Sequence, residues 1–374
     1  MLSFLLLTAV AGVAHGKRYP ITFKDGLPTE PFIQVAVEVG TPPQTVHVLF
    51  DSGSPLFWVP ASNETVDGLS YVVEYNPNIS STAEPAGFDT SFTYGGFSVN
   101  GPTYTDLAGL DSPLIRQNVT SATLSAPIVS LFLGGRWDGS RYPSAEAWFE
   151  IGDSNGADSE FGDPSKCVAL PPKSEEARLV PVFRPPLTFT FWWQFDVTKF
   201  SIGDRESTGR AEALVDDGTS IIMGNFASIF SPDPVPDNIC EYTYKNNATF
   251  DIQIASTDGG SPGVYTLGWE DVTFSDNMYF YESRESESGC LLSHQADDWP
   301  ETVFILGLPF YNKHLIKHDY AGDGQVCVTD KPEGYEKLWQ SPASPNFNTT
   351  STATKASFKV LSAVAALAVT AAWM

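Results

Sequence analysis

Two stretches of this 374-residue chain share one pattern: VLFDSGS at residues 48–54 and ALVDDGTS at residues 213–220. In each, three apolar residues typical of a buried strand lead into Asp, one further residue, Gly, and then Ser or Thr. A single Asp-x-Gly-Ser sequence is common in ordinary turns. Its repetition behind two buried-strand patterns predicts two related halves, each of which presents one carboxylate, Asp51 or Asp216, at the end of a strand.

The rest of the chain is typical of short β-strands separated by Gly, Pro, Asn and Asp. Long amphipathic helical patterns are absent, and 30 Gly and 28 Pro are spread along the sequence. The sequence therefore predicts an all-β protein. The strands are predicted at residues 32–39, 45–50, 91–99, 128–133, 189–195, 213–215 and 303–306.

The charge of the chain excludes one class of partner. Asp and Glu number 45 against 21 Lys and Arg, for a formal net charge of -24, so the chain would repel nucleic acid. Ordinary solubility explains such acidity, and work in an acidic medium is a second interpretation. No cysteine pair or histidine cluster has metal-site spacing, so we expect no metal and no cofactor.

The amino-terminal end carries a processing signal. Residues 5–13 form an apolar run that ends in Ala14-His15-Gly16, which predicts a signal peptide at residues 1–16, although no basic residue precedes the run. Lys17-Arg18 then offers a dibasic cleavage point.

The carboxyl-terminal end predicts a glycolipid (GPI) anchor. Residues 360–374 are apolar but too short for a comfortable membrane-spanning helix. They follow a Ser/Thr-rich stalk at residues 341–359, in which Asn348 or Ser351 could be the attachment site. A short tail anchor or a buried terminal helix is the alternative.

Cysteines and glycosylation sequons fit a secretory route. Four cysteines predict two disulfides in an oxidising compartment, and the sequence alone permits three pairings. The cysteines are Cys167, Cys240, Cys290 and Cys327. The sequons are at Asn63, Asn78, Asn118, Asn247 and Asn348.

The repeated pattern suits peptide hydrolysis. One carboxylate can take a proton from water while a second, protonated carboxyl polarises the carbonyl, provided that the two share a proton. Gly53 and Gly218 permit tight loops whose N–H groups reach the carboxylates. The hydroxyls of Ser54 and Thr219 can donate to the outer carboxylate oxygens.

Several motifs together resemble the pepsin-like aspartic peptidases, in particular secreted, GPI-anchored members of fungal type. They are GTPPQ at 40–44, LFDSGS at 49–54, FWVP at 57–60, FTYG at 92–95, ALVDDGTS at 213–220 and FILG at 304–307 followed by Phe310-Tyr311. This resemblance covers roughly residues 32–328 and implies a monomer with two pseudo-two-fold related lobes, at residues 19–180 and 181–340.

The resemblance also implies roles for individual residues. Asp51 and Asp216 would be catalytic, Tyr94 would close over substrate from a flap hairpin, and Trp58 would hydrogen-bond Tyr94. Cys240 would pair with Cys290, and Cys167 with Cys327. Protein or peptide substrates are implied, with no cofactor.

Three features depart from the family's pattern. Asp217 stands where Ser or Thr is usual, and it cannot donate a hydrogen bond unless protonated. A supporting Asp-Gly-apolar-apolar-Gly strand is missing between Tyr94 and Ile128, where residues 107–109 match it poorly. About a dozen residues between Arg18 and the first strand leave no room for an inhibitory pro-segment.

The sequence thus predicts an aspartic endopeptidase with an acid pH optimum, at the cell surface and attached to the membrane by its anchor. The first alternative is a catalytically inactive relative that binds peptide or cell-wall polymer, which Asp217 and the missing strand would favour. A glycosidase with two carboxylates is a more distant alternative.

Overall fold

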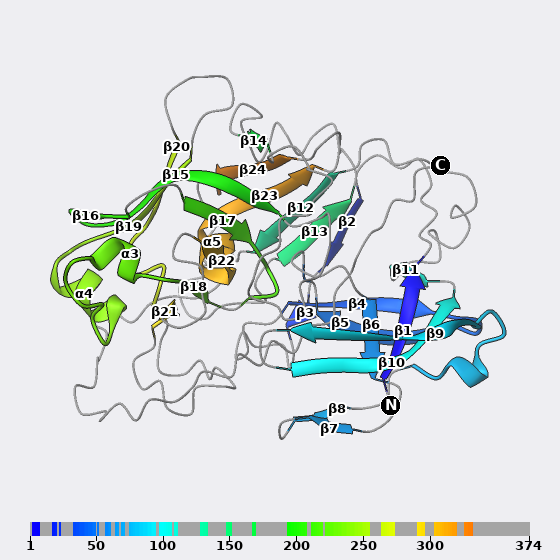
Figure 1. The fold of residues 1–374 in the computed structure, drawn as a ribbon. Helices are drawn as coiled ribbons and strands as arrows, with labels where there is room; N and C mark the ends of the chain where they lie inside the picture. Colours follow the sequence, from blue (N-terminus) through cyan, green and yellow to red (C-terminus); the bar gives the residue numbers. More distant parts are fainter. Residues whose placement is uncertain are drawn as a thin grey trace, which may run out of the picture.

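The computed structural model describes residues 2–7, 17–20, 22–23, 33–49, 51, 57–60, 64–66, 69–71, 75–94, 97–106, 108–110, 128–133, 147–151, 167–169, 193–207, 211–219, 221–254, 263–273, 290–295, 303–319 and 325–331. In this part of the chain strands dominate and the helices are short (Figure 1). The all-β, two-lobed fold predicted from the sequence is confirmed.

The second half forms one sheet in the order β20-β19-β15-β17-β22-β18-β21, with β16 paired to β15. β22 is buried at every position, because it runs parallel to β17 on one side and antiparallel to β18 on the other. This central position explains its uninterrupted apolar sequence. The strands are β15 (Gln194–Ile202), β16 (Arg205–Glu206), β17 (Ala211–Val215), β18 (Ile222–Gly224), β19 (Phe250–Ile254), β20 (Gly263–Leu267), β21 (Leu292–His294) and β22 (Val303–Leu306).

Four buried aromatic rings fill the core of this half. Phe304 on β22 lies with its ring centroid 4.1 Å from that of Phe200 and 5.1 Å from that of Phe226. Phe250 stacks on Phe200 at 5.8 Å. All four side chains are fully buried, and such aromatic pairs stabilise a core beyond the area that they bury.

The first half forms two smaller sheets and a hairpin. In one sheet β4 lies between β11 and β3 and also pairs with β5, and its Val35, Val37 and Val39 are buried in the alternation of a strand with one covered face. The other sheet has the order β6-β1-β10-β9. The strands are β1 (Leu2–Leu7), β3 (Thr22–Phe23), β4 (Ile33–Val39), β5 (Gln44–Leu49), β6 (Phe57–Pro60), β7 (Glu64–Val66), β8 (Leu69–Tyr71), β9 (Glu84–Tyr94), β10 (Phe97–Asp106) and β11 (Ala108–Leu110).

A third sheet contains strands from both halves, in the order β14-β24-β23-β12-β13-β2. Its central contact joins β12 to β23, with Val129 opposite His318. The strands are β2 (Lys17–Pro20), β12 (Ile128–Leu133), β13 (Ala147–Ile151), β14 (Cys167–Ala169), β23 (His314–Asp319) and β24 (Gln325–Asp330). This shared sheet connects the two lobes (Figure 1).

The helical elements of the described residues are η2 (Pro77–Ile79), α3 (Ala227–Phe230), α4 (Ile239–Lys245) and α5 (Leu308–Lys313). Asn238 caps α4 by accepting a hydrogen bond from the Glu241 N–H. Within the described residues, no helix has the length and apolar character needed to cross a membrane.

The predicted strands and the observed ones differ at two places. Residues 91–99, predicted as one strand, span the end of β9 and the start of β10, with Tyr94 opposite Phe97. The strand predicted at residues 189–195 is described from Gln194 onwards and continues to Ile202. The other predicted strands agree with the structure within two residues.

The position beside β6 is occupied by an unexpected strand. β1 (Leu2–Leu7) runs antiparallel to β6 and parallel to β10. β11, which contains residues from the poor match at 107–109, pairs with β4 instead. The supporting strand expected after Tyr94 is therefore not the one that lies beside β6. That position is taken by β1, which belongs to the predicted signal peptide.

Candidate active site

Asp216 follows the last residue of β17, and the loop after it holds its carboxylate from two sides. The Gly218 N–H donates to Oδ1 of Asp216 at 3.0 Å, and the Thr219 hydroxyl donates to Oδ2 at 2.5 Å. The Asp216 N–H in turn donates to the carbonyl of Leu306 in β22 at 3.2 Å. Both oxygens of the Asp216 carboxyl group are thereby fixed in position.

The support beneath this loop comes from the chain that follows β22. The Leu308 N–H donates to the carbonyl of Thr219 at 2.8 Å. Gly307 lies so close that a Cβ atom there would be 2.2 Å from the carbonyl oxygens of Thr219 and Ile221. Only Gly fits this contact, which explains the Gly at the end of the predicted apolar-apolar-Gly strand.

Asp51 contacts the second loop directly. A Cβ atom at Gly218 would lie 2.4 Å from Cγ of Asp51, so the Gly218 backbone packs against that carboxyl group. The Asp51 side chain is 4% exposed. Gly218 therefore belongs to both halves of the site: its N–H holds Asp216 and its bare Cα makes room for Asp51.

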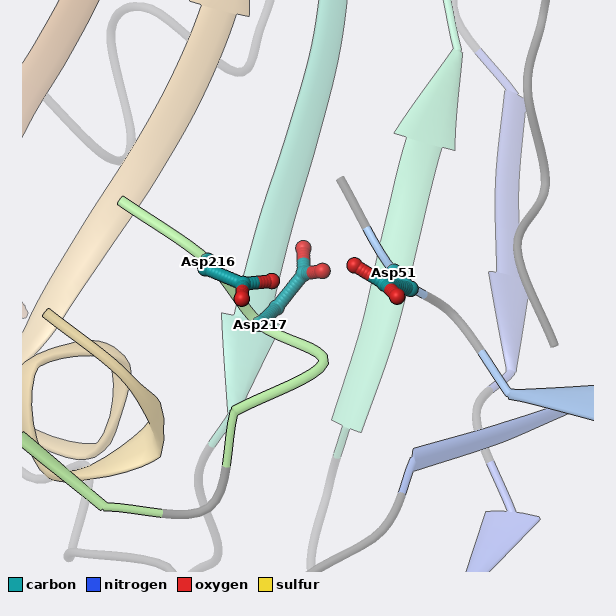
Figure 2. Close-up of side chains that lie close together, drawn as sticks. All are labelled: Asp51, Asp216 and Asp217. Atoms are coloured by element: carbon teal, nitrogen blue, oxygen red, sulfur yellow. The ribbon is translucent and has the colours of Figure 1, made fainter. Parts of the chain in front are cut away.

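Asp217 joins the pair as a third carboxyl group. One carboxylate oxygen from each of Asp51, Asp216 and Asp217 lies within 4.8 Å of the others. Figure 2 shows the Asp217 carboxyl group directed into the space between Asp216 and Asp51. Asp217 is 1% exposed, so its side chain does not turn away to solvent.

This crowding governs the electrostatics of the site. Like charges at such separations in a buried environment oppose complete ionisation, because neither distance nor water weakens their repulsion. One carboxyl group can then act as a hydrogen-bond donor while another accepts a proton, which is the division of roles that general acid–base catalysis requires.

A metal ion in a protein takes His, Cys, Asp or Glu ligands. Among the described residues, these same three carboxylates have ligand atoms close enough together to hold one. Acidic groups of this kind are common without a metal. The sequence predicts no metal, and the direct hydrogen bonds of Thr219 and Gly218 to Asp216 suit a protonic site equally well.

Several predicted site residues lie outside what the structure describes. Gly53 and Ser54 fall between the described residues Asp51 and Phe57. Tyr94 is the last residue of β9 and Trp58 lies in β6, but the positions of their side chains are not described. The roles implied for these four residues stay predictions.

The cysteines and sequons are placed in part. Cys240 and Cys290 form a disulfide with a Cα–Cα distance of 5.5 Å. Cys327 is also disulfide-bonded, and Cys167 lies opposite it in the β14–β24 pair. Asn78 and Asn247 are exposed, whereas Asn63 and Asn118 lie outside the described residues.

The sequence pattern did not reveal one buried carboxylate of the first half. Asp106, at the end of β10, is 4% exposed and accepts hydrogen bonds from Tyr75 and Thr82. No local motif marks it, because its partners are 31 and 24 residues away in sequence.

Comparison with known proteins finds similarity to aspartic proteases. The model of the family described as eukaryotic aspartyl protease matches residues 34–134, which include Asp51. Napsin-A of Mus musculus is 27% identical over 325 residues, 78% of this chain and 74% of that protein. A probable vacuolar protease A of Arthroderma benhamiae is 24% identical, with 78% of this chain and 76% of that protein covered.

A third relative, cathepsin E-A of Xenopus laevis, is 26% identical over 236 residues. This match covers 55% of the chain and 58% of that protein, so less than two thirds of the relative is spanned.

Proposed function

We propose that this chain, which the comparisons relate to the pepsin-like aspartic proteases, is an endopeptidase that cleaves proteins at acid pH with Asp51 and Asp216 as its catalytic pair. The observation that carries the proposal is the contact of the two loops. Gly218 packs on Asp51 and donates to Asp216, so the two carboxyl groups share one site.

The reaction needs one proton on the pair. The ionised carboxylate takes a proton from a bound water, whose oxygen attacks the peptide carbonyl carbon, while the protonated carboxyl gives its proton to the carbonyl oxygen. This sharing of a proton is the arrangement for which aspartic proteases are the standard example. The resulting diol collapses as the nitrogen takes up a proton and the C–N bond breaks, which leaves a carboxylic acid, an amine and the original pair.

The residues around Asp216 serve this chemistry. Hydrogen bonds from Gly218 and Thr219 to the carboxyl group of Asp216 fix its orientation. Asp51 is buried, which limits the access of bulk water to its carboxyl group.

The test is cleavage of a denatured protein at acid pH, with and without a statine-type inhibitor. We expect inhibitor-sensitive cleavage that falls roughly hundred- to ten-thousandfold in Asp51→Asn and in Asp216→Asn, because each change removes one proton-transfer group. Asp204→Asn, at an exposed carboxylate in the turn between β15 and β16, is the matched control and should leave the rate unchanged. Absence of cleavage by the natural protein at every acid pH would contradict the proposal.

We further propose a secreted monomer that is held to the outer membrane leaflet or the cell wall by a glycolipid. The support is the apolar run before Lys17, the Ser/Thr-rich residues 341–359 and the apolar residues 360–374. A phosphatidylinositol-specific phospholipase should release the protein from intact cells. Detection of residues 360–374 in the mature chain by mass spectrometry would contradict the anchor.

A further inference from the structure

A buried carboxylate far from the catalytic pair joins three segments of the first half. Asp106, the last residue of β10, accepts a hydrogen bond from the Tyr75 hydroxyl at 2.6 Å on one oxygen and from the Thr82 hydroxyl at 2.6 Å on the other. Tyr75 is 0% exposed and Asp106 is 4% exposed. The pKa of Tyr75 is raised by burial and by Asp106, so its hydroxyl keeps the proton that it donates.

The turn between β4 and β5 sits on the same carboxylate. Gly40 has a φ of +84°, and a Cβ atom there would be 2.6 Å from Oγ of Ser80 and 3.0 Å from Oδ2 of Asp106. The Thr41 N–H donates to Oγ of Ser80 at 3.0 Å. The Thr82 hydroxyl, besides its bond to Asp106, lies 3.2 Å from the hydroxyl of Thr41.

A second pair of hydrogen bonds fixes the end of this turn. The Asn76 N–H donates to the side-chain oxygen of Gln44 at 2.8 Å, and the Gln44 amide group donates to the Asn76 carbonyl at 3.0 Å. Residues 75–82 are therefore attached both to the β4–β5 turn and to the end of β10.

Two strands extend from this cluster, and one of them leads to Asp51. β5 begins at Gln44, and Asp51 follows seven residues later, roughly 23 Å away if extended at about 3.3 Å per residue. β10 extends from Asp106 back to Phe97, roughly 30 Å on the same basis, where it meets Tyr94 of β9. β9 and β10 form a long hairpin (Figure 1), so a small rotation at the cluster would produce a large displacement at the opposite end of the hairpin.

We propose that Asp106, Tyr75 and Thr82 form the fixed base of the β9–β10 hairpin and set the position of its tip relative to Asp51. They are positioning residues, since they act on a bound peptide only through the hairpin. The effect on peptide binding rests on the proposed function, whereas the fixed base can be measured without any activity.

The experiment compares two Tyr→Phe variants. Tyr75→Phe removes the hydroxyl that donates to Asp106. Tyr265→Phe is the matched control, because it removes a buried hydroxyl of the second half that donates to the Val328 carbonyl in β24. Amide hydrogen exchange of residues 84–106 should accelerate roughly tenfold or more in Tyr75→Phe, the size expected for a lost hydrogen bond to a buried charge. It should stay unchanged in Tyr265→Phe.

A second pair guards against a variant that fails to fold. Thr82→Val removes the other donor to Asp106 and should accelerate exchange in the same residues, whereas Thr82→Ser keeps the hydroxyl and should restore slow exchange. In cleavage assays the loosened variants should raise KM several-fold with a smaller change in kcat. Hairpin exchange at the natural rate in both Tyr75→Phe and Thr82→Val would overturn the proposal; absent cleavage with accelerated exchange would overturn only the proposed function.

Discussion

The two halves support their candidate catalytic carboxylates, Asp51 and Asp216, in different ways. In the second half, Ile222 of β18 stands six residues after Asp216 and pairs with Leu306 of β22. In the first half, Phe57 of β6 stands six residues after Asp51 and pairs with Leu5 of β1. The two registers correspond, yet β22 comes from the body of the same half and β1 from the beginning of the chain.

The difference extends to the neighbouring strand. β22 also runs parallel to β17, the strand that leads into Asp216, and so connects both sides of the active-site loop. β1 runs parallel to β10 of the hairpin instead. The second half thus builds a closed support from its own strands, whereas support beside Asp51 depends on what happens to residues 1–16.

The largest expected effect concerns Gly218, which contacts the carboxyl groups of both Asp51 and Asp216. Gly218→Ala would place a Cβ atom 2.4 Å from Cγ of Asp51, so either the loop or Asp51 must move. Because catalysis is sensitive to displacements of about 1 Å, we expect cleavage to fall roughly hundredfold or more. Gly263→Ala is the control, since its Cβ would meet its nearest atom at 3.5 Å, and there the cleavage rate should be unchanged. Full activity in Gly218→Ala would contradict the close contact between Asp51 and the loop after Asp216.

The second prediction compares β6 with β18. If the signal peptide is removed after residue 16, as the sequence predicts, β6 loses its partner strand β1, whereas β18 keeps its partner strand β22. We then expect the secreted protein to begin at Lys17, or at Tyr19 if the dibasic site is also cut, and faster amide exchange in residues 57–60 than in residues 222–224. Edman sequencing and hydrogen exchange measure the two. Recovery of Leu2–Leu7 in the mature chain would show instead that β1 is part of the working fold.

The third prediction concerns the sheet that joins the halves. His318 on β23 is fully buried against the edge of Trp193, and burial lowers its pKa from 6.5 to about 3. The unfolded chain therefore binds a proton that the folded chain does not between pH 6.5 and about 3, so stability falls as the pH falls through this window. Between pH 7 and pH 4 this group should cost the fold roughly 3 kcal/mol.

Urea unfolding at the two pH values tests this cost. His318→Gln removes the titration but keeps a polar group near the Tyr311 hydroxyl, 3.3 Å from the imidazole, so the variant should lose less stability in acid than the natural protein. Equal losses in both proteins would assign the acid sensitivity to other groups. An acid-active enzyme with this histidine must tolerate a weakened connection between its lobes.

The sequence predicted those features whose cause is local. The apolar run before Asp216 and the fully apolar β22 predict buried strands, and both strands are buried, because a strand covered on both faces admits no polar alternation. The position of β1 could not be predicted, since an apolar run at residues 5–13 has the same composition as a signal peptide. The Asp106 cluster escaped for another reason: a carboxylate with partners 31 and 24 residues away leaves no periodic mark in the sequence.

The smallest expected effect tests the remaining asymmetry, the acidic residue Asp217 beside the candidate catalytic carboxylate of the second half. Asp217 is buried and directed into the space between Asp216 and Asp51, where a third negative charge makes complete ionisation costly (Figure 2). The cluster should therefore keep its last proton to higher pH than a pair alone, and activity should extend further on the alkaline side.

Asp217→Thr removes the charge and supplies a hydroxyl donor, so we expect faster cleavage at acid pH and an alkaline limb displaced to lower pH by about one unit. Asp217→Asn separates the two causes, because it removes the charge without adding a hydroxyl and should move the limb alone. Identical pH profiles in all three proteins would mean that Asp217 does not titrate with the pair, and the difference between the halves would then lie in their strands.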